Sequence, residues 1–228
     1  MSMLVFKVNY SLEKDALNYL SSLWKLRYLK HGRRFLSENL SNGFPNEFIR
    51  GLKAIDDKPT ARKYVSDYLR VQHPFFREYI NRVQKRSQNT LNEEASEIAL
   101  SLEKVYGLRF PFNQIGVYIT TLKICPYDYP ERWFMISVYG DPKSHLNTAL
   151  HELNHFMFYY YFGKLRGELG HEKFESLKEA LTVFTNPDEE GYPAQRRLRA
   201  WLARQKGTIS EIIREGKWED FSGERFRS

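Results

Sequence analysis

The feature that most constrains this chain is a pair of histidines, His151 and His155, within the sequence His-Glu-Leu-Asn-His. In a helix, side chains at positions i and i+4 lie one turn apart on the same face, so both imidazoles can bind one metal ion. Glu152 follows about 100° further round such a helix, where its carboxylate can hydrogen-bond a metal-bound water without being a ligand. The motif therefore predicts a helix at this point and a metal on one of its faces.

The residues on either side of the motif predict a small sheet followed by helices. Residues 116–123 and 133–140 are rich in β-branched and aromatic residues, and we expect them to be two strands paired as a hairpin. Asp141 and Pro142 supply a capping side chain and a first-turn proline for the motif helix, which should run to about Phe162. Further helices are expected over 172–184, 194–205 and 209–215.

Helical periodicity dominates the first part of the chain, from Ser11 to about Tyr106. Pro74 should interrupt this part, and Thr90 should cap its last helix, which Gly107 should end. We therefore predict an α+β protein with a helical N-terminal region (1–106). The second region (107–228) should hold the small sheet, the motif helix and the C-terminal helices.

The stretch from about Ile115 to Thr185 resembles the zincin group of zinc metallopeptidases, in which a small sheet precedes the H-E-x-x-H helix and a later helix supplies the third ligand. Residues 177–184 are similar to the glutamate helix of gluzincins, which implies that Glu179 joins His151 and His155 as a ligand of Zn²⁺. The resemblance implies hydrolysis of a peptide or protein substrate, with Glu152 as general base and then general acid. It also implies a donor for the oxyanion, for which the candidates are Tyr139, His145, Tyr192 and Arg196.

Some positions depart from the related patterns. Val183 stands where some gluzincins have an aspartate that orients a zinc-bound histidine. Tyr161 stands where metzincins have their third histidine, which excludes the metzincin subclass. His171 and Glu175 are alternatives to Glu179 as third ligand. The segment around His171 resembles the third-ligand segment of SprT-type proteases, which act on DNA-bound proteins.

The charge of the chain supports an alternative function. There are 35 basic and 28 acidic side chains, a formal net charge of +7. Five basic residues fall within 25–34 and four arginines within 194–204, a pattern typical of a solvated helix face or of a nucleic-acid-binding surface. Two alternatives to a peptidase with no nucleic-acid role are thus open. One is a nucleic-acid-associated SprT-like protease, and the other is a non-catalytic binding protein in which zinc only holds two helices together.

Cysteine content and hydropathy bear on the compartment. The single cysteine, Cys125, excludes an internal disulfide and favours a reducing environment. No apolar run approaches the roughly 18 residues needed to cross a bilayer, and the first residues lack the pattern of a secretory signal. We therefore expect a cytoplasmic protein with no membrane partner, whose oligomeric state the sequence does not indicate.

Overall fold

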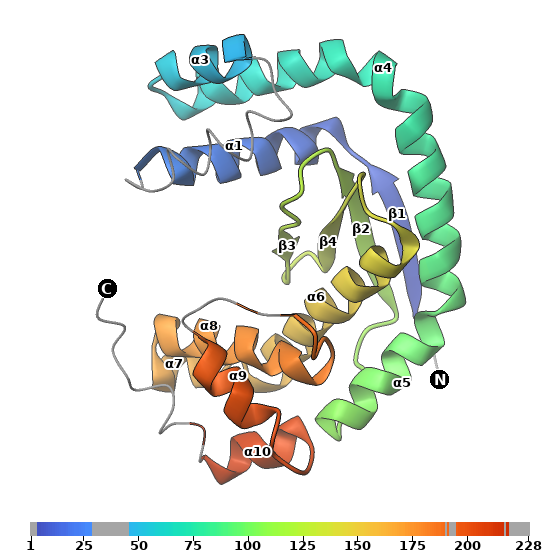
Figure 1. Ribbon diagram of the computed structural model, residues 1–228, viewed down its shortest axis with the longest axis vertical. Coiled ribbons are helices and arrows are strands. Elements are labelled where there is room, and N and C mark those ends of the chain that lie inside the picture. The colour runs from blue at the N-terminus through green and yellow to red at the C-terminus, as the bar shows by residue number, and fades with distance from the viewer. Residues whose placement is uncertain (1–3, 29–45, 190, 192–194, 217, 219–228) are drawn as a thin grey trace.

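The computed structural model describes residues 4–28, 46–189, 191, 195–216 and 218, without the side chains of residues 23–28 and 46. It combines many helices with one small sheet, as the α+β prediction requires (Figure 1). The elements are β1 (Val5–Tyr10), α1 (Leu12–Tyr28), α3 (Asn46–Ala54), α4 (Lys58–Glu93), α5 (Ala95–Tyr106), β2 (Gln114–Thr120), β3 (Tyr127–Asp128), β4 (Trp133–Ser137), α6 (Pro142–Phe162), α7 (Leu165–Leu169), α8 (His171–Ala180), the 3₁₀ helix η2 (Leu181–Phe184), α9 (Arg196–Leu202) and α10 (Ile209–Glu215).

The sheet has the strand order β1-β2-β4-β3. β2 pairs with β1 on one side and with β4 on the other, both in parallel, whereas β3 runs antiparallel to β4. The prediction of a hairpin between the second and last strands is therefore wrong. The connection at 121–132 leaves the sheet after β2 and forms β3 on the far side of β4, so the chain enters β4 in the same direction as β2.

β1 lies inside the region 1–106, which sequence analysis describes as helical. Its side chains alternate, with Phe6 and Val8 buried and Lys7 exposed, so the period of two was present in the sequence. The free edge of β1 is covered by side-chain amides from α4, which runs beside it (Figure 1). We call these amides, Gln84, Gln88 and Asn92, the amide ladder. They bond the backbone of Phe6 and Val8 at 2.6–3.1 Å.

α4 is one continuous helix, so the predicted interruption at Pro74 is wrong. Instead, Figure 1 shows α4 bending between the top of the molecule and its right side, as a proline inside a helix permits. Thr90 lies within α4 rather than at an N-cap, because its carbonyl accepts the Glu94 N–H that ends the helix. Gly107 ends α5 with a φ of 67°, as predicted.

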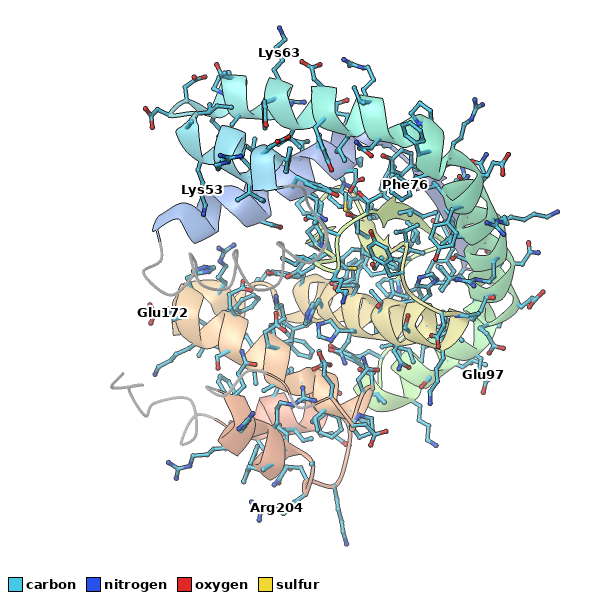
Figure 2. All side chains as sticks on the ribbon, turned by 45° about the horizontal axis from the view of Figure 1, so that its top comes forward. Lys53, Lys63, Phe76, Glu97, Glu172 and Arg204 are labelled. Carbon is cyan, nitrogen blue, oxygen red and sulfur yellow. The ribbon has the colours of Figure 1, made fainter. Side chains whose placement is uncertain are left out.

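Two apolar clusters lie along the chain. The larger one joins the sheet to α5, α6, α8 and the second half of α4, and the smaller one joins α1, α3 and the first half of α4. The first 106 residues thus contribute to the main core as well as to their own. Charged side chains such as Lys63, Glu97 and Arg204 project from the outside of the helices (Figure 2). Among the described helices, none combines the length and apolar character needed to span a bilayer.

Candidate metal centre

α6 carries the two histidines, and its start is fixed as the sequence predicts. The Asp141 side chain accepts the Ser144 N–H at 2.7 Å, and Pro142 occupies the first turn. Leu153, Phe156 and Met157 on one side of α6 are buried in the main core. The opposite side therefore presents His151 and His155 to α8.

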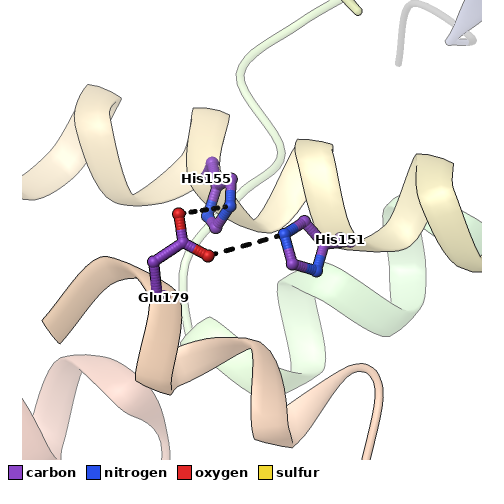
Figure 3. A group of neighbouring side chains, drawn as sticks. All are labelled: His151, His155 and Glu179. Atoms are coloured by element: carbon purple, nitrogen blue, oxygen red, sulfur yellow. Dashed lines mark ion pairs between the residues drawn. The ribbon is translucent and has the colours of Figure 1, made fainter. Parts of the chain in front are cut away.

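Glu179, near the end of α8, faces both histidines (Figure 3). Its Oε1 lies 3.5 Å from His155 Nε2, and its Oε2 lies 3.7 Å from His151 Nε2. One potential ligand atom from each of the three residues lies within 4.8 Å of the others. In a tetrahedral zinc site with bonds near 2.05 Å, neighbouring ligand atoms are about 3.3 Å apart. The two histidine–glutamate distances, which reach different oxygens of the carboxylate, exceed this spacing by a few tenths of an ångström, so the three side chains lie close enough to share one zinc ion after side-chain adjustment.

Asn154, between the two histidines in sequence, ties α6 to η2 and to the residue that follows it. Its Nδ2 donates to Leu181 O at 3.4 Å and to Thr185 Oγ1 at 3.2 Å. Its own carbonyl and side-chain oxygens accept from the Tyr106 hydroxyl at 2.8 and 2.9 Å. All of these groups are buried or partly buried, so the spacing between the histidines and Glu179 is set by a satisfied polar network rather than by packing alone.

Glu189 supplies a contact that sequence analysis missed. Its Oε2 accepts a hydrogen bond from His151 Nδ1 at 3.0 Å, which places the proton on Nδ1 and leaves the Nε2 lone pair for a metal. Metal-bound histidines are commonly oriented by such a contact, so if His151 binds a metal, Glu189 would take the place of the aspartate that is lacking at Val183. Because Glu189 lies in the irregular segment after η2, no helical spacing could have indicated it.

Arg199 on α9 holds the segment that carries Glu189. Its guanidinium is buried and donates to Glu189 O at 2.7 Å, to Asn186 O at 3.2 Å and to Glu179 O at 3.3 Å. It also donates to Thr182 Oγ1. One basic side chain thus joins the segment after η2 to the end of α8 and to η2.

Lys178 places a buried positive charge beside the candidate ligands. Its Nζ lies 2.9 Å from Glu179 Oε1 and 2.9 Å from Glu175 Oε2, and only 3% of its side chain is exposed. Burial by itself would lower the pKa of Lys178, but the two carboxylates outweigh it and raise the pKa. In turn, His155 and Lys178 overcome the effect of burial on Glu179 and hold its pKa well below the usual range.

His155 and Glu152 are the two most buried titratable groups of the motif. Burial lowers the pKa of His155 to about 4, so its imidazole is neutral at neutral pH, the form that binds metals. Burial raises the pKa of Glu152 to about 8. Among the described residues, neither Glu152 Oε2 nor His155 Nδ1 has a hydrogen-bond partner. A buried carboxyl oxygen without a partner is costly, so its position in the motif calls for an explanation.

These residues line one open cleft of about 1050 Å³. Its floor is formed by His151, Glu152 and His155 of α6, and Glu179 faces them. One wall is the segment at 123–127, which leads into β3, and the other is the segment at 185–189 with Gly191. The three candidate ligands and Glu152 thus all line one cleft.

The other predicted site residues lie elsewhere. The His171 side chain is 66% exposed and contacts Arg166 and Glu175, and the potential ligand group found among the described residues contains neither His171 nor Glu175. Of the oxyanion candidates, Tyr139 is exposed, and His145 is buried between Ser87 Oγ and Ser137 O. Neither these two nor Arg196 lines the cleft, and Tyr192 lies outside the described residues.

The predicted basic surfaces are only partly visible. The side chains of residues 25–34 lie outside the described part of the chain. In the second basic segment, at 194–204, Arg199 is committed to the loop contacts given above. That segment therefore contributes fewer free charges than its sequence indicates.

Comparison with protein-family models, with curated proteins and with solved structures finds no match to this chain. The class of protein to which the site belongs must therefore follow from its own donor atoms. Two imidazoles and a carboxylate are a donor set found in some catalytic zinc sites and also in non-haem iron sites.

Proposed function

We propose that this protein is a zinc-dependent peptidase with a zincin-like core. In this proposal His151, His155 and Glu179 hold Zn²⁺, and Glu152 is the general base and acid. The observation that carries it is the approach of the Glu179 carboxylate to both Nε2 atoms, 3.5 and 3.7 Å away, on the floor of an open cleft. A surface helix with two unrelated histidines gives no reason for a carboxylate from another helix to be held between them.

A zinc ion bound by these residues would lower the pKa of a water molecule and polarise the carbonyl group of a substrate. The charge of the ion would also lower the pKa of the Glu152 carboxyl, which burial raises to about 8, and so favour the carboxylate. As a carboxylate, Glu152 would take a proton from the attacking water and return it to the leaving amine. Its Oε2, which has no partner among the described residues, is the atom available for this transfer. Glu189 keeps the His151 ring in place through Nδ1, and the neutral state of His155 leaves a lone pair for the metal.

We assign Tyr127, which lines the cleft beside His155, as the donor to the substrate carbonyl oxygen. It lies on β3, lines the cleft, and its ring centroid is 5.3 Å from that of His155. Lys178 donates a short hydrogen bond to the Tyr127 hydroxyl oxygen, and the Tyr159 hydroxyl, which itself donates to Glu175, lies 3.4 Å away. The Tyr127 proton can therefore point to Tyr159 and would turn from this long contact to a substrate oxygen. Hydrogen bonds to developing negative charge contribute strongly to catalysis, so a hydroxyl held in this way supports the proposed reaction.

The edges of the sheet support a peptide as substrate. The edge at β1 is covered by the amide ladder, whereas β3, the strand at the other edge, lies beside the cleft. An extended peptide can bind by adding a strand to an exposed sheet edge. The cleft-side edge is thus the place in this sheet at which a peptide backbone would meet the candidate ligands.

The proposal is tested with Glu152→Gln and a mixed peptide library read by mass spectrometry. Zinc-loaded wild type should cleave peptides, and a chelator should stop it. Glu152→Gln should keep one zinc per chain and its fold but lose cleavage by at least about a hundredfold, because an amide cannot accept the proton. Lys173→Gln, which neutralises an exposed charge on α8, is the control and should cleave normally. Cleavage that Glu152→Gln retains in full would refute the proposed mechanism.

A further inference from the structure

A run of exposed apolar residues lies on α4, far along the chain from the candidate metal centre. We define the α4 elbow as residues 70–79, around Pro74. The smaller apolar cluster uses α4 up to Leu69, and the larger one begins at Ile80. Within the described part of the chain, no elbow residue is buried, and Figure 2 shows Phe76 at this bend.

The elbow exposes more apolar surface than its position between two cores requires. Phe75 is 80% exposed, and Val71, one helical turn before it, is 64% exposed. Phe76 and Tyr79 are 44% and 40% exposed. Tyr139, which is 60% exposed, lies close to Tyr79, and partial burial together with this neighbour raises the pKa of Tyr139. Adjacent exposed aromatic residues of this kind mark interaction surfaces.

The sequence in and after the elbow is rich in positive charge. Between residues 70 and 86 the chain has five basic side chains, Arg70, Arg77, Arg82, Lys85 and Arg86, and one acidic side chain, Glu78. Arg70 is paired with Asp67, and Arg86 donates to Gly140 O. The Arg82 guanidinium lies 5.8 Å from the centre of the Tyr79 ring. An occupant of the elbow must therefore be apolar at its centre and negatively charged around it.

We propose that the α4 elbow binds the surface of an anionic lipid bilayer. Phenylalanine and valine side chains enter the boundary between headgroups and acyl chains, tyrosines lie at the level of the headgroups, and arginines and lysines attract anionic lipid. A second copy of this chain is disfavoured, because symmetric pairing of two elbows would bring like charges together. The pair Val71 and Phe75 offers no polar group to a base edge, which favours lipid over a nucleic acid. This proposal departs from the expectation of no membrane partner, which rested on the length of apolar runs and does not bear on a helix that lies on the membrane surface.

The test is flotation of the full chain with vesicles of phosphatidylcholine, alone or with about one third phosphatidylglycerol. The protein should bind the anionic vesicles, not the neutral ones, and high salt should weaken binding. Phe75→Ser combined with Phe76→Ser should reduce binding about tenfold or more. Arg77→Gln should reduce it about fivefold, the effect of one charge near an anionic surface.

Leu100→Ser is the matched control, because Leu100 is 56% exposed on α5 and lies outside the elbow. It should bind vesicles as wild type does, and circular dichroism should show that all variants are folded. Failure to bind either vesicle, or equal binding by the double phenylalanine variant, would overturn the proposal. The proposal would also be overturned if the wild type bound itself or a single-stranded oligonucleotide instead of vesicles, and if the double phenylalanine variant lost that binding. None of these outcomes depends on the metal centre.

Discussion

The contact between Glu189 and His151 gives the most direct test of how the candidate zinc site is built. Glu189→Gln keeps the shape of the side chain and an oxygen that can accept from Nδ1, but it removes the negative charge. A hydrogen bond to a charged group contributes about 1.5–3 kcal/mol and a neutral one about 0.5–1.5 kcal/mol. Because the Glu189 side chain is 40% exposed, solvent screening places the difference at the lower end, about 1 kcal/mol. Zinc affinity should therefore fall about fivefold.

The assay is competition for zinc against a chromophoric chelator at neutral pH, followed for each variant. Asp188→Asn is the control, because Asp188 is next to Glu189, also lines the cleft and is exposed, but makes no contact with His151 among those found in the described chain. It should change the affinity less than twofold. The reasoning is refuted if Glu189→Gln binds zinc as tightly as wild type, or if both variants weaken zinc equally. Glu179→Gln should lose far more, since it removes a proposed ligand.

Other changes should give distinct results. Tyr127→Phe should lower kcat about a hundredfold with KM and zinc content unchanged, as steady-state kinetics with metal analysis can show; an unchanged kcat would exclude the proposed donor. Arg199→Met should lower the free energy of unfolding by about 2–4 kcal/mol in urea titrations, because buried carbonyl oxygens lose their donor, and an effect below about 0.5 kcal/mol would contradict this. Burial lowers the pKa of His145 in the folded chain, so the unfolded chain binds the extra proton as the pH falls below about 6.5. The wild type should therefore lose stability below that pH, by at most about 1.4 kcal/mol per pH unit from this group, and His145→Gln should lose less; parallel pH curves would count against it.

The sequence indicated the local features of this protein better than its long-range ones. The motif helix, its Asp141 cap and the Gly107 end of α5 depend on residues a few positions apart, and the structure shows them as predicted. The hairpin prediction was wrong because the chain passes beyond β4 and forms β3 there before it enters β4, which makes β4 parallel to β2. The predicted interruption at Pro74 was wrong because α4 packs into one apolar cluster before Pro74 and into the other after it, so the helix continues through the proline.

The candidate site shows the same difference between local features, which the sequence indicates, and long-range contacts, which it does not. The spacing of the two histidines follows from helix geometry, and the resemblance to gluzincins led to Glu179, which the structure places against both rings. Glu189 and Tyr127 reach the site from an irregular segment and from a two-residue strand. Their positions depend on how Arg199 and Lys178 hold them, and no periodic pattern records such contacts.

The amide ladder has a consequence for how this protein would fail under stress. Because Gln88 and Asn92 occupy the backbone groups of Phe6, strands from other molecules cannot extend the sheet at β1 while α4 is in place. Growth of the sheet by strand addition is then confined to the edge at β3, beside the cleft. Aggregation through the native sheet and occupation of the candidate site would compete for the same edge. A peptide bound in the cleft should therefore slow aggregation as well as block the site.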